Sequence, residues 1–104
     1  MMLTPSHRLI LSYDVQPDRF QQYYLYVRGE FVPTLQKLGL HMIFAWQVHG
    51  EGQPGRQIEF ICESGEILCQ ALQNERFQHA EERLKSYTTQ YQRKVVRFKN
   101  RFQF

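Results

Sequence analysis

The sequence has little of what holds a small secreted domain or a membrane segment in place. It contains only two cysteines among 104 residues, Cys62 and Cys69, and the disulfide framework of a secreted domain of this length needs more. No apolar run approaches the roughly 20 residues that cross a bilayer, and residues 1–8 contain no hydrophobic stretch of the kind found in signal peptides. We therefore expect free thiols, no membrane partner and a cytoplasmic location.

The charge is also too balanced to indicate a class of partner. Thirteen basic and ten acidic side chains give a net charge of +3, a mildly basic mixture of both signs. Aromatic rings, by contrast, are abundant, with eight Phe, six Tyr and one Trp. The length fits a single domain over residues 1–104. Its core is modest, so we expect part of this aromatic surface to be buried between subunits.

The spacing of apolar residues predicts the order β-α-β-β-α-β. Patterns typical of strands occur over residues 8–15, 40–49, 57–63 and 92–104, and a glycine-rich turn at 50–55 joins the second to the third. Helical spacing covers residues 17–39 and 64–91, with a break at Asn74. The fold class is therefore α+β, a ferredoxin-like domain with an antiparallel four-stranded sheet.

The expected first helix has clear ends and one weak point. Pro17 opens it and Gly39 ends it. Pro33 cannot donate a hydrogen bond to the carbonyl of Gly29, so we expect a kink or a break between these two residues. One apolar stripe should face the core, formed by Phe20, Tyr24, Val27, Phe31, Leu35 and Leu38.

Both faces of the predicted sheet carry apolar residues. In the first strand Leu9, Leu11 and Tyr13 lie opposite Ile10, and in the second Phe44 and Trp46 lie opposite Ile43 and Ala45. Helices cover only one face of a ferredoxin-like sheet, and an apolar open face is more than a soluble monomer usually exposes. A second copy of the chain would cover it by two-fold symmetry, so we expect a homodimer. Further apolar surface comes from Phe98, Phe102 and Phe104.

Several short stretches resemble a known group of proteins. They are Tyr13 at the end of the first strand, Arg28-x-x-Phe31-x-Pro33 with Leu38-Gly39, Ala45-Trp46, Asn74-Glu75-Arg76-Phe77 and Val95-Val96-Arg97-Phe98. With these features the chain resembles the dimeric α/β-barrel superfamily, and within it the NIPSNAP-like proteins. The resemblance covers nearly the whole chain and implies a homodimer in which two sheets pair into a dimeric α/β barrel.

The same resemblance leaves the chemistry open. The superfamily includes cofactor-free monooxygenases, haem-degrading enzymes, isomerases, stress-response proteins and many members of unknown role. The haem-degrading members would call for an Asn–Trp–His set, and this chain has Trp46 and His79 but no Asn in its first strand. We expect no cofactor. Whether the protein is an enzyme stays open, and for an enzyme the resemblance implies cofactor-free monooxygenase or isomerase chemistry.

A small apolar or aromatic molecule is the ligand that we expect, bound between sheet and helices and lined by Tyr13, Tyr24 and Trp46. Arg28 precedes the weak point of the first helix. It lies either at the mouth of a cleft, where it would hold an anionic or oxygenated ligand, or in solvent beside a carboxylate. The alternative function is a non-catalytic assembly or scaffold module whose aromatic residues serve only the interface. An enclosed pocket of a few hundred Å³ would favour the ligand.

Histidine and cysteine spacing argues against a metal site. His41 and His49 share a strand face but lie on the order of 26 Å apart at the rise of a strand, and no His-x-x-x-His or Cys-x-x-Cys spacing occurs. Cys62 alternates with buried positions, which favours a small core residue over a nucleophile. His41 could act as a general base, but in a regular strand it faces away from Trp46.

The last strand carries a basic stripe of Arg93, Lys94, Arg97, Lys99 and Arg101. Some ferredoxin-like sheets bind RNA by stacking bases on strand aromatics. Residues 56–63 lack the glycine and paired aromatics of those modules, and Glu59 and Glu63 would repel phosphate. We therefore do not expect nucleic acid binding, and RNA recognition is the weaker alternative function. The stripe is interpreted as a charged edge that discourages aggregation between strands.

Overall fold

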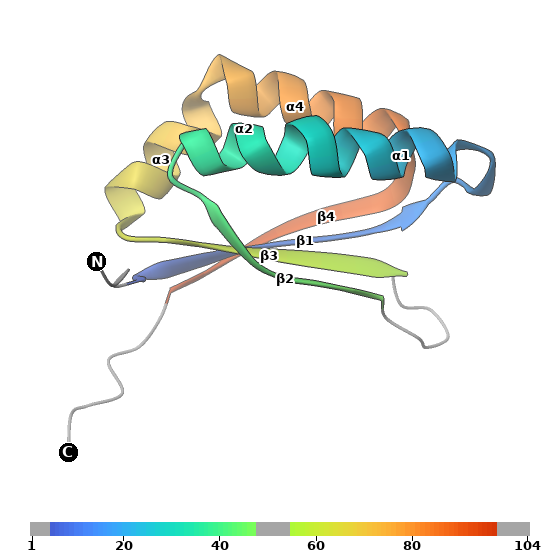
Figure 1. Ribbon diagram of the computed structural model, residues 1–104. Helices are drawn as coiled ribbons and strands as arrows, with labels where there is room; N and C mark the ends of the chain where they lie inside the picture. The colour runs from blue at the N-terminus through green and yellow to red at the C-terminus, as the bar shows by residue number, and fades with distance from the viewer. Residues whose placement is uncertain (1–4, 48–54, 98–104) are drawn as a thin grey trace.

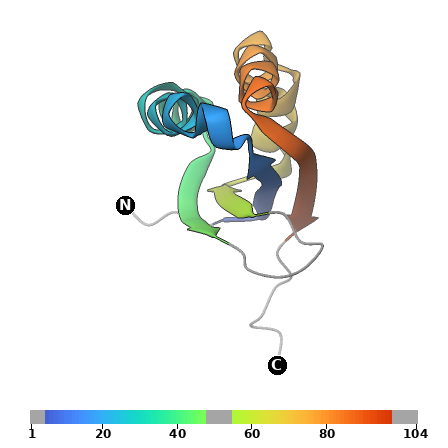
Figure 2. The ribbon, with the colours of Figure 1, turned by 90° about the vertical axis from the view of Figure 1, so that its right-hand side faces the viewer.

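Four strands form one antiparallel sheet in the computed structural model, which describes residues 5–47 and 55–97. Across the sheet the order is β2, β3, β1, β4, and the strands are β1 His7–Val15, β2 His41–Gln47, β3 Arg56–Cys62 and β4 Thr88–Arg97. The helices lie on one face of this sheet, and the other face is open (Figures 1 and 2). The predicted β-α-β-β-α-β order and ferredoxin-like fold are therefore confirmed, with a sheet that does not close on itself.

Some expectations fall outside the described residues. They concern the turn over residues 50–54 and the side chains of Phe44, Val48, His49, Phe98, Lys99, Arg101, Phe102 and Phe104. The account of the strands and their faces is therefore confined to the described part of the chain.

The first helical segment runs through its weak point without a break. It consists of η1 Pro17–Arg19, α1 Phe20–Tyr26, the π-helical η2 Val27–Phe31 and α2 Val32–Lys37, which lie in line in Figure 1. The backbone N–H of Val32 donates to the carbonyl of Val27, five residues back. This wider turn accommodates Pro33, which has no N–H to donate. A π turn thus stands where we predicted a kink or a break.

The π turn also changes which residues face the sheet. Phe20 and Tyr24, expected on the buried stripe, are 42% and 44% exposed, and the buried face is formed by Tyr23, Tyr26, Val27, Phe31 and Leu35. A turn with an extra residue rotates the first half of the helix relative to the second. A stripe drawn at a constant 3.6 residues per turn is therefore out of phase in the first half. The prediction is wrong for Phe20 and Tyr24 and right from Val27 to Leu35.

Three local signals set helix ends where the sequence predicts them. Gly39 adopts a φ of 92°, and the backbone hydrogen bonds around it close a Schellman turn after α2. The side chain of Ser64 caps α3 Gly65–Gln73, and that of Asn74 caps α4 Glu75–Ser86. Each signal acts over a few residues, which is why the sequence alone reveals it.

The second helical region ends earlier than its periodicity predicts. Helix α4 stops at Ser86 and β4 begins at Thr88, so Tyr91 belongs to the strand and not to a helix that runs to residue 91 as predicted. Gln90 has a φ of 56°, and the register of β4 against β1 shifts there. Beyond this bulge the ring of Tyr91 stacks on that of Tyr13, with centroids 6.2 Å apart.

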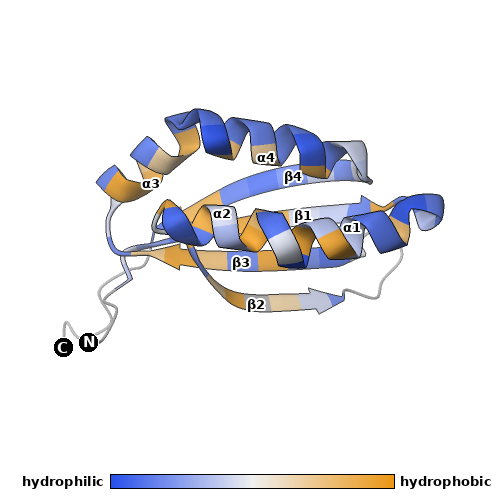
Figure 3. Ribbon diagram, turned by 45° about the horizontal axis from the view of Figure 1, so that its top comes forward, coloured by the Kyte–Doolittle hydropathy of each residue, from blue (hydrophilic) through white to orange (hydrophobic). Residues whose placement is uncertain are grey.

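The core lies between the sheet and the helices. The outer turns of α4 are largely hydrophilic in Figure 3, whereas Phe77, Ala80 and Leu84 on its inner side are buried. Cys62 is 1% exposed, which agrees with its predicted role as a small core residue. The largest fully buried side chains are Tyr13, Phe31, Phe60, Phe77, Leu9, Leu11, Leu35, Leu40 and Leu84.

A bulge interrupts β2. Met42 pairs with Phe60 of β3, but the next paired position is Phe44 with Glu59, so the backbone of Ile43 is an extra residue. Directly paired residues of antiparallel strands point to the same side of a sheet. The bulge therefore reverses the alternation of β2 halfway along its length.

This reversal redistributes the side chains of β2. Met42 and Ala45 both lie on the side that the helices cover, because they pair with Phe60 and Ile58 of the core. His41 and Trp46 lie together on the other side. The expectation that these two residues face opposite sides holds only for a regular strand, and the bulge makes it wrong.

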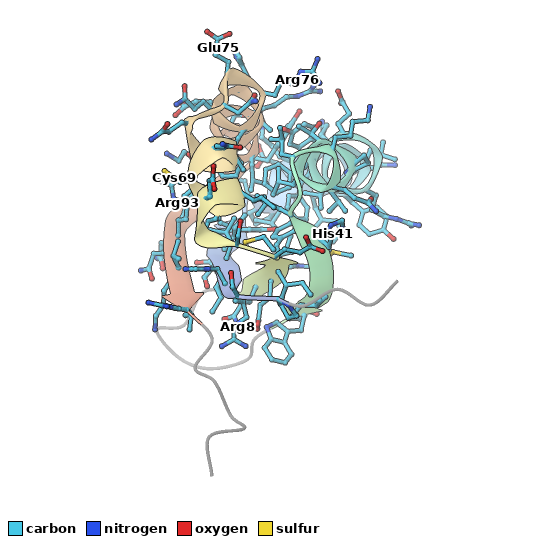
Figure 4. All side chains as sticks on the ribbon, turned by 90° about the vertical axis from the view of Figure 1, so that its left-hand side faces the viewer. Arg8, His41, Cys69, Glu75, Arg76 and Arg93 are labelled. Atoms are coloured by element: carbon cyan, nitrogen blue, oxygen red, sulfur yellow. The ribbon has the colours of Figure 1, made fainter. Side chains whose placement is uncertain are left out.

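The open face of the sheet is mixed rather than apolar. Arg8 Nη1 lies 3.2 Å from Glu59 Oε1, and Gln57 donates to the same carboxylate at 3.0 Å. Figure 4 shows Arg8 on the side of the sheet away from the helices. Glu59 is only 4% exposed and the Arg8 side chain is 34% exposed, so the centre of this face is a half-buried ion pair. The prediction of two-sided apolar strands holds around it, at Ile10, Trp46, Ile61 and Val96.

Candidate ligand-binding pocket

A pocket of about 400 Å³ lies between the first helical segment and the edge of the sheet. One wall comes from α1, η2 and α2, and the other from β2 and β3. The lining residues are Tyr23, Tyr24, Val27, Arg28, Val32, Met42, Ala45, Trp46, Arg56, Gln57 and Ile58. The pocket thus lies within a single chain, on the β2 side of the core, and is partly open to solvent.

Two irregularities shape the apolar part of this pocket. The π turn presents Val27 and Val32 from the helix, and the bulge of β2 brings Met42 and Ala45 to the same side of the strand. A small residue at position 45 leaves space beside the helix that a longer side chain would fill. An apolar lining with few polar groups is the usual composition of a site for a small molecule.

The aromatic part contains a hydrogen-bonded tyrosine pair. Tyr23 lines the pocket, and its phenol oxygen lies 2.7 Å from that of Tyr13. Burial raises the pKa of Tyr13 and, with Arg56 acting in the opposite direction, also raises the pKa of Tyr23. Both phenols therefore stay neutral near pH 7, when they can donate a hydrogen bond but not act as a base.

Two arginines supply the charged part. Arg28 Nη1 donates to the phenol oxygen of Tyr24 at 2.8 Å, and its guanidinium lies 5.3 Å from the centre of that ring. The guanidinium of Arg56 lies 5.0 Å from the ring centre of Phe20 and 6.0 Å from that of Tyr23. Both cations are thus held against aromatic faces at the pocket.

The sequence-predicted site residues come together in part. Tyr24, Arg28 and Trp46 all line the pocket. Tyr13 does not line it but lies behind its wall, in contact with Tyr23. Arg28 is exposed and bonded to Tyr24, not to Glu30, whose carboxylate pairs with an arginine of α4.

Sequence reasoning missed Tyr23 and Arg56. A helical stripe of constant period does not include Tyr23, because the π turn shifts the phase of the helix. A signal for Arg56 was available, since it opens the strand after the glycine-rich turn and a hairpin places it beside the end of the preceding strand. The structure pairs it with Gln47, next to Trp46.

The other candidate groups lie away from this pocket. Burial raises the pKa of the Cys62 thiol, which makes it a poorer nucleophile. His41 is on the open face of the sheet, and His79 is on α4 beside Arg76, in a shallow basic depression. Over residues 5–47 and 55–97, no three His, Cys, Asp or Glu side chains gather into a group that could hold a metal ion. In the same ranges, no helix has the length and apolarity to cross a membrane.

The described part of the basic stripe is only partly free in solvent. Arg93 Nη1 lies 2.9 Å from Glu81 Oε2 of α4, and its guanidinium lies 5.8 Å from the ring centre of Phe77. Lys94 and Arg97 are exposed on β4, which is an edge strand. Arg93 therefore ties the strand to the helix layer, and the other two cations occupy the sheet edge as predicted.

The sequence matches no protein-family model and no curated protein. The structure, however, is similar to solved structures over nearly their whole length. A protein of the ethyl tert-butyl ether d (EthD) family from Bacillus halodurans has a TM-score of 0.68 at 16% identity, over 90% of this chain and 99% of that one. A NIPSNAP family protein from Agrobacterium tumefaciens has a TM-score of 0.60 at 15% identity, over 97% and 92% of the two chains.

A third structure is described as a dimeric ferredoxin-like protein and comes from an uncultured marine organism. Its TM-score is 0.63 at 17% identity, and the match covers 94% of this chain and 91% of that one. At such identities the likeness concerns the fold. The resemblance to NIPSNAP-like proteins that the sequence predicts is thus confirmed at that level: the chain has the ferredoxin-like fold found in NIPSNAP and EthD family proteins.

Proposed function

We propose that the protein binds a small apolar or aromatic molecule in the pocket between the first helical segment and the β2–β3 edge of the sheet. The observation that carries this proposal is a space of about 400 Å³ lined by rings and aliphatic side chains, with a few polar groups from both walls. This is the size and composition of small-molecule sites in general. A module that only assembles would need no such space beside its solid core.

We further propose that the protein works as a homodimer whose open sheet faces meet. Ile10, Ile61 and Val96 lie on the face that no helix covers, and a second copy would bury them. A structural neighbour described as dimeric supports the same idea. Trp46 belongs both to this face and to the lining of the pocket, so a partner would also shield that side of the ligand from water.

Fluorescence titration tests the ligand proposal. Phenylnaphthylamine is an uncharged aromatic probe. Trp46, the only tryptophan of the chain, lines the pocket and is near enough to transfer excitation energy to a probe bound there. The variant Ala45→Phe fills the space, and Gln36→Phe adds the same ring to an exposed position of α2 outside the lining. We expect the wild type and Gln36→Phe to bind the probe and Ala45→Phe to lose binding.

Two results would contradict the proposal. Failure of the wild type to bind would leave the assembly module as the better description. Equal binding by Ala45→Phe would place the probe elsewhere, for example on the open sheet face.

Light scattering on a sizing column tests the dimer. We expect twice the chain mass of 12.6 kDa and a shift toward 12.6 kDa in Ile61→Lys, which adds a cation beside Arg8. The matched control is Leu25→Lys on the outer side of α1, where Leu25 is 66% exposed. A wild-type monomer, or equal effects of both variants, would rule out the open face as the interface.

A further inference from the structure

Among the described residues, the lining of the pocket has two positive charges and no negative one. Arg28 reaches it from η2 and Arg56 from the start of β3, and every other lining side chain is neutral near pH 7. The two cations come from opposite walls. Because apolar walls focus the field of nearby charges, the interior of the pocket is electropositive.

Within the described residues these two arginines have no carboxylate partner, which is also true of Arg19, Arg76 and Arg97. Arg8, Arg83 and Arg93 each lie within 3.2 Å of a carboxylate oxygen. Among the described residues, neither Arg28 nor Arg56 has a carboxylate within 4.0 Å. What distinguishes Arg28 and Arg56 is that both line one pocket, where no described carboxylate neutralises them.

The contacts of the two guanidinium groups leave donors for an anion. The guanidinium carbon of Arg28 lies 5.3 Å from the ring centre of Tyr24, and that of Arg56 lies 5.0 Å from the ring centre of Phe20. A cation–π contact uses no N–H group of the guanidinium, and arginine N–H groups can bind carboxylates and sulfonates bidentately. Arg28 uses one N–H for Tyr24, and the rest of its donors remain.

We infer that the ligand of this pocket is an aromatic or apolar acid whose anionic group binds Arg28 and Arg56 while its apolar part lies against Val27, Met42 and Ala45. This inference rests on the proposed function, because it names the chemical class of the same ligand. Tyr23 adds a neutral hydroxyl at the wall, and the absence of an acidic lining residue removes the repulsion that would otherwise exclude such a ligand.

A matched pair of probes separates charge from ring binding. Anilinonaphthalene sulfonate and phenylnaphthylamine share their rings and differ by the sulfonate. We expect the wild type to bind the sulfonate about tenfold more tightly, since charge-assisted hydrogen bonds of moderate exposure contribute on that scale. In Arg28→Gln/Arg56→Gln the preference should disappear, while the affinity for phenylnaphthylamine changes by less than about twofold.

The controls keep the outcome interpretable. Arg76→Gln removes the same charge from an exposed position of α4 outside this pocket, and it should leave the preference intact. Circular dichroism shows whether each variant folds. If loss of the ring contacts unfolds the double variant, Arg56→Lys replaces it as a variant that keeps the positive charge at this position. Equal binding of both probes by the wild type would contradict the inference that the ligand is an acid, but not the proposal that the pocket binds a small molecule. Binding of neither would overturn the pocket function itself.

Discussion

The phenol oxygens of Tyr13 and Tyr23 lie 2.7 Å apart, so one hydrogen bond joins the middle of the sheet to the wall of the pocket. Tyr13 is fully buried on β1 and Tyr23 is 3% exposed on α1. Their rings meet edge to face, with centroids 5.7 Å apart and an angle of 68°. Each hydroxyl is the polar partner of the other in a region that is otherwise apolar. The bond therefore fixes the orientation of the Tyr23 ring at the wall of the pocket.

Removal of both hydroxyls should destabilise the fold by less than the sum of the two single removals. Tyr13→Phe leaves the Tyr23 hydroxyl buried without its partner, and we expect a loss of roughly 1 to 2 kcal/mol in the free energy of unfolding. Tyr23→Phe should cost about as much. The double variant should lose about 1 kcal/mol less than the sum of the two single losses, because no buried hydroxyl is left without a hydrogen-bond partner. Urea unfolding followed by Trp46 fluorescence measures all four proteins, and additive losses would contradict the coupling.

Alkaline pH should weaken the fold through its buried tyrosines. Burial raises the pKa of Tyr26 from the ordinary value of about 10 to about 12. Above pH 10 the unfolded chain gives up this proton while the folded chain keeps it. The contribution of Tyr26 is therefore complete below about pH 10 and is lost as the pH rises toward about 12.

The control for this pH dependence is Tyr26→Phe. The variant loses the hydrogen bond from the phenol to the carbonyl of Ala80, so it should be less stable than the wild type at neutral pH. The difference in unfolding free energy between the two proteins should be constant below about pH 10 and narrow above it. An unfolding free-energy difference that stays the same at pH 11 would show that the pKa of Tyr26 is not raised in the folded chain.

Features set by neighbouring residues could be predicted from the sequence, and those set by pairing across the sheet could not. The ends of helices at Gly39, Ser64 and Asn74 depend on side chains and φ angles a few residues apart. The bulges at Ile43 and Gln90 depend on how two distant strands meet. Each bulge reverses an alternation that otherwise runs regularly along the sequence.

The pocket shows the same division. Tyr24, Arg28 and Trp46 could be selected as candidates because each stands out locally, beside a helix weak point or in an apolar strand. Tyr23 could not, because its place depends on the π turn. Arg56 could have been selected from the predicted hairpin, which places it beside the end of the preceding strand. The charge of the pocket comes from Arg56 as much as from Arg28, so its sign follows only from the two walls together.

Substitution by alanine should change the stability of the fold in opposite directions at Gly29, within the first helical segment, and at Gly39, just after it. At Gly39 the φ is 92° and a Cβ would lie 2.7 Å from Cγ2 of Ile67, so Gly39→Ala should lower the free energy of unfolding by about 2 kcal/mol. At Gly29 a Cβ would meet nothing within 4 Å, and Gly29→Ala should raise it by roughly 0.5 to 1 kcal/mol. Thermal unfolding distinguishes the two, and stabilisation by Gly39→Ala would contradict the Schellman turn.

Substitution of two glutamines of β4 by glycine should change the stability of the fold in opposite directions, because the backbone of only one of them is left-handed. Gln90 occupies the left-handed region with a φ of 56°, which costs a residue with a side chain roughly 1 kcal/mol, so Gln90→Gly should stabilise the fold by up to about that amount. Gln92 is exposed like Gln90 but lies in regular register opposite Ser12, and Gln92→Gly should cost about 0.5 to 1 kcal/mol. Urea unfolding measures both variants. If Gln90→Gly were as destabilising as Gln92→Gly, β4 would have no bulge at that position, and the inward placement of Tyr91 against Tyr13 would need another explanation.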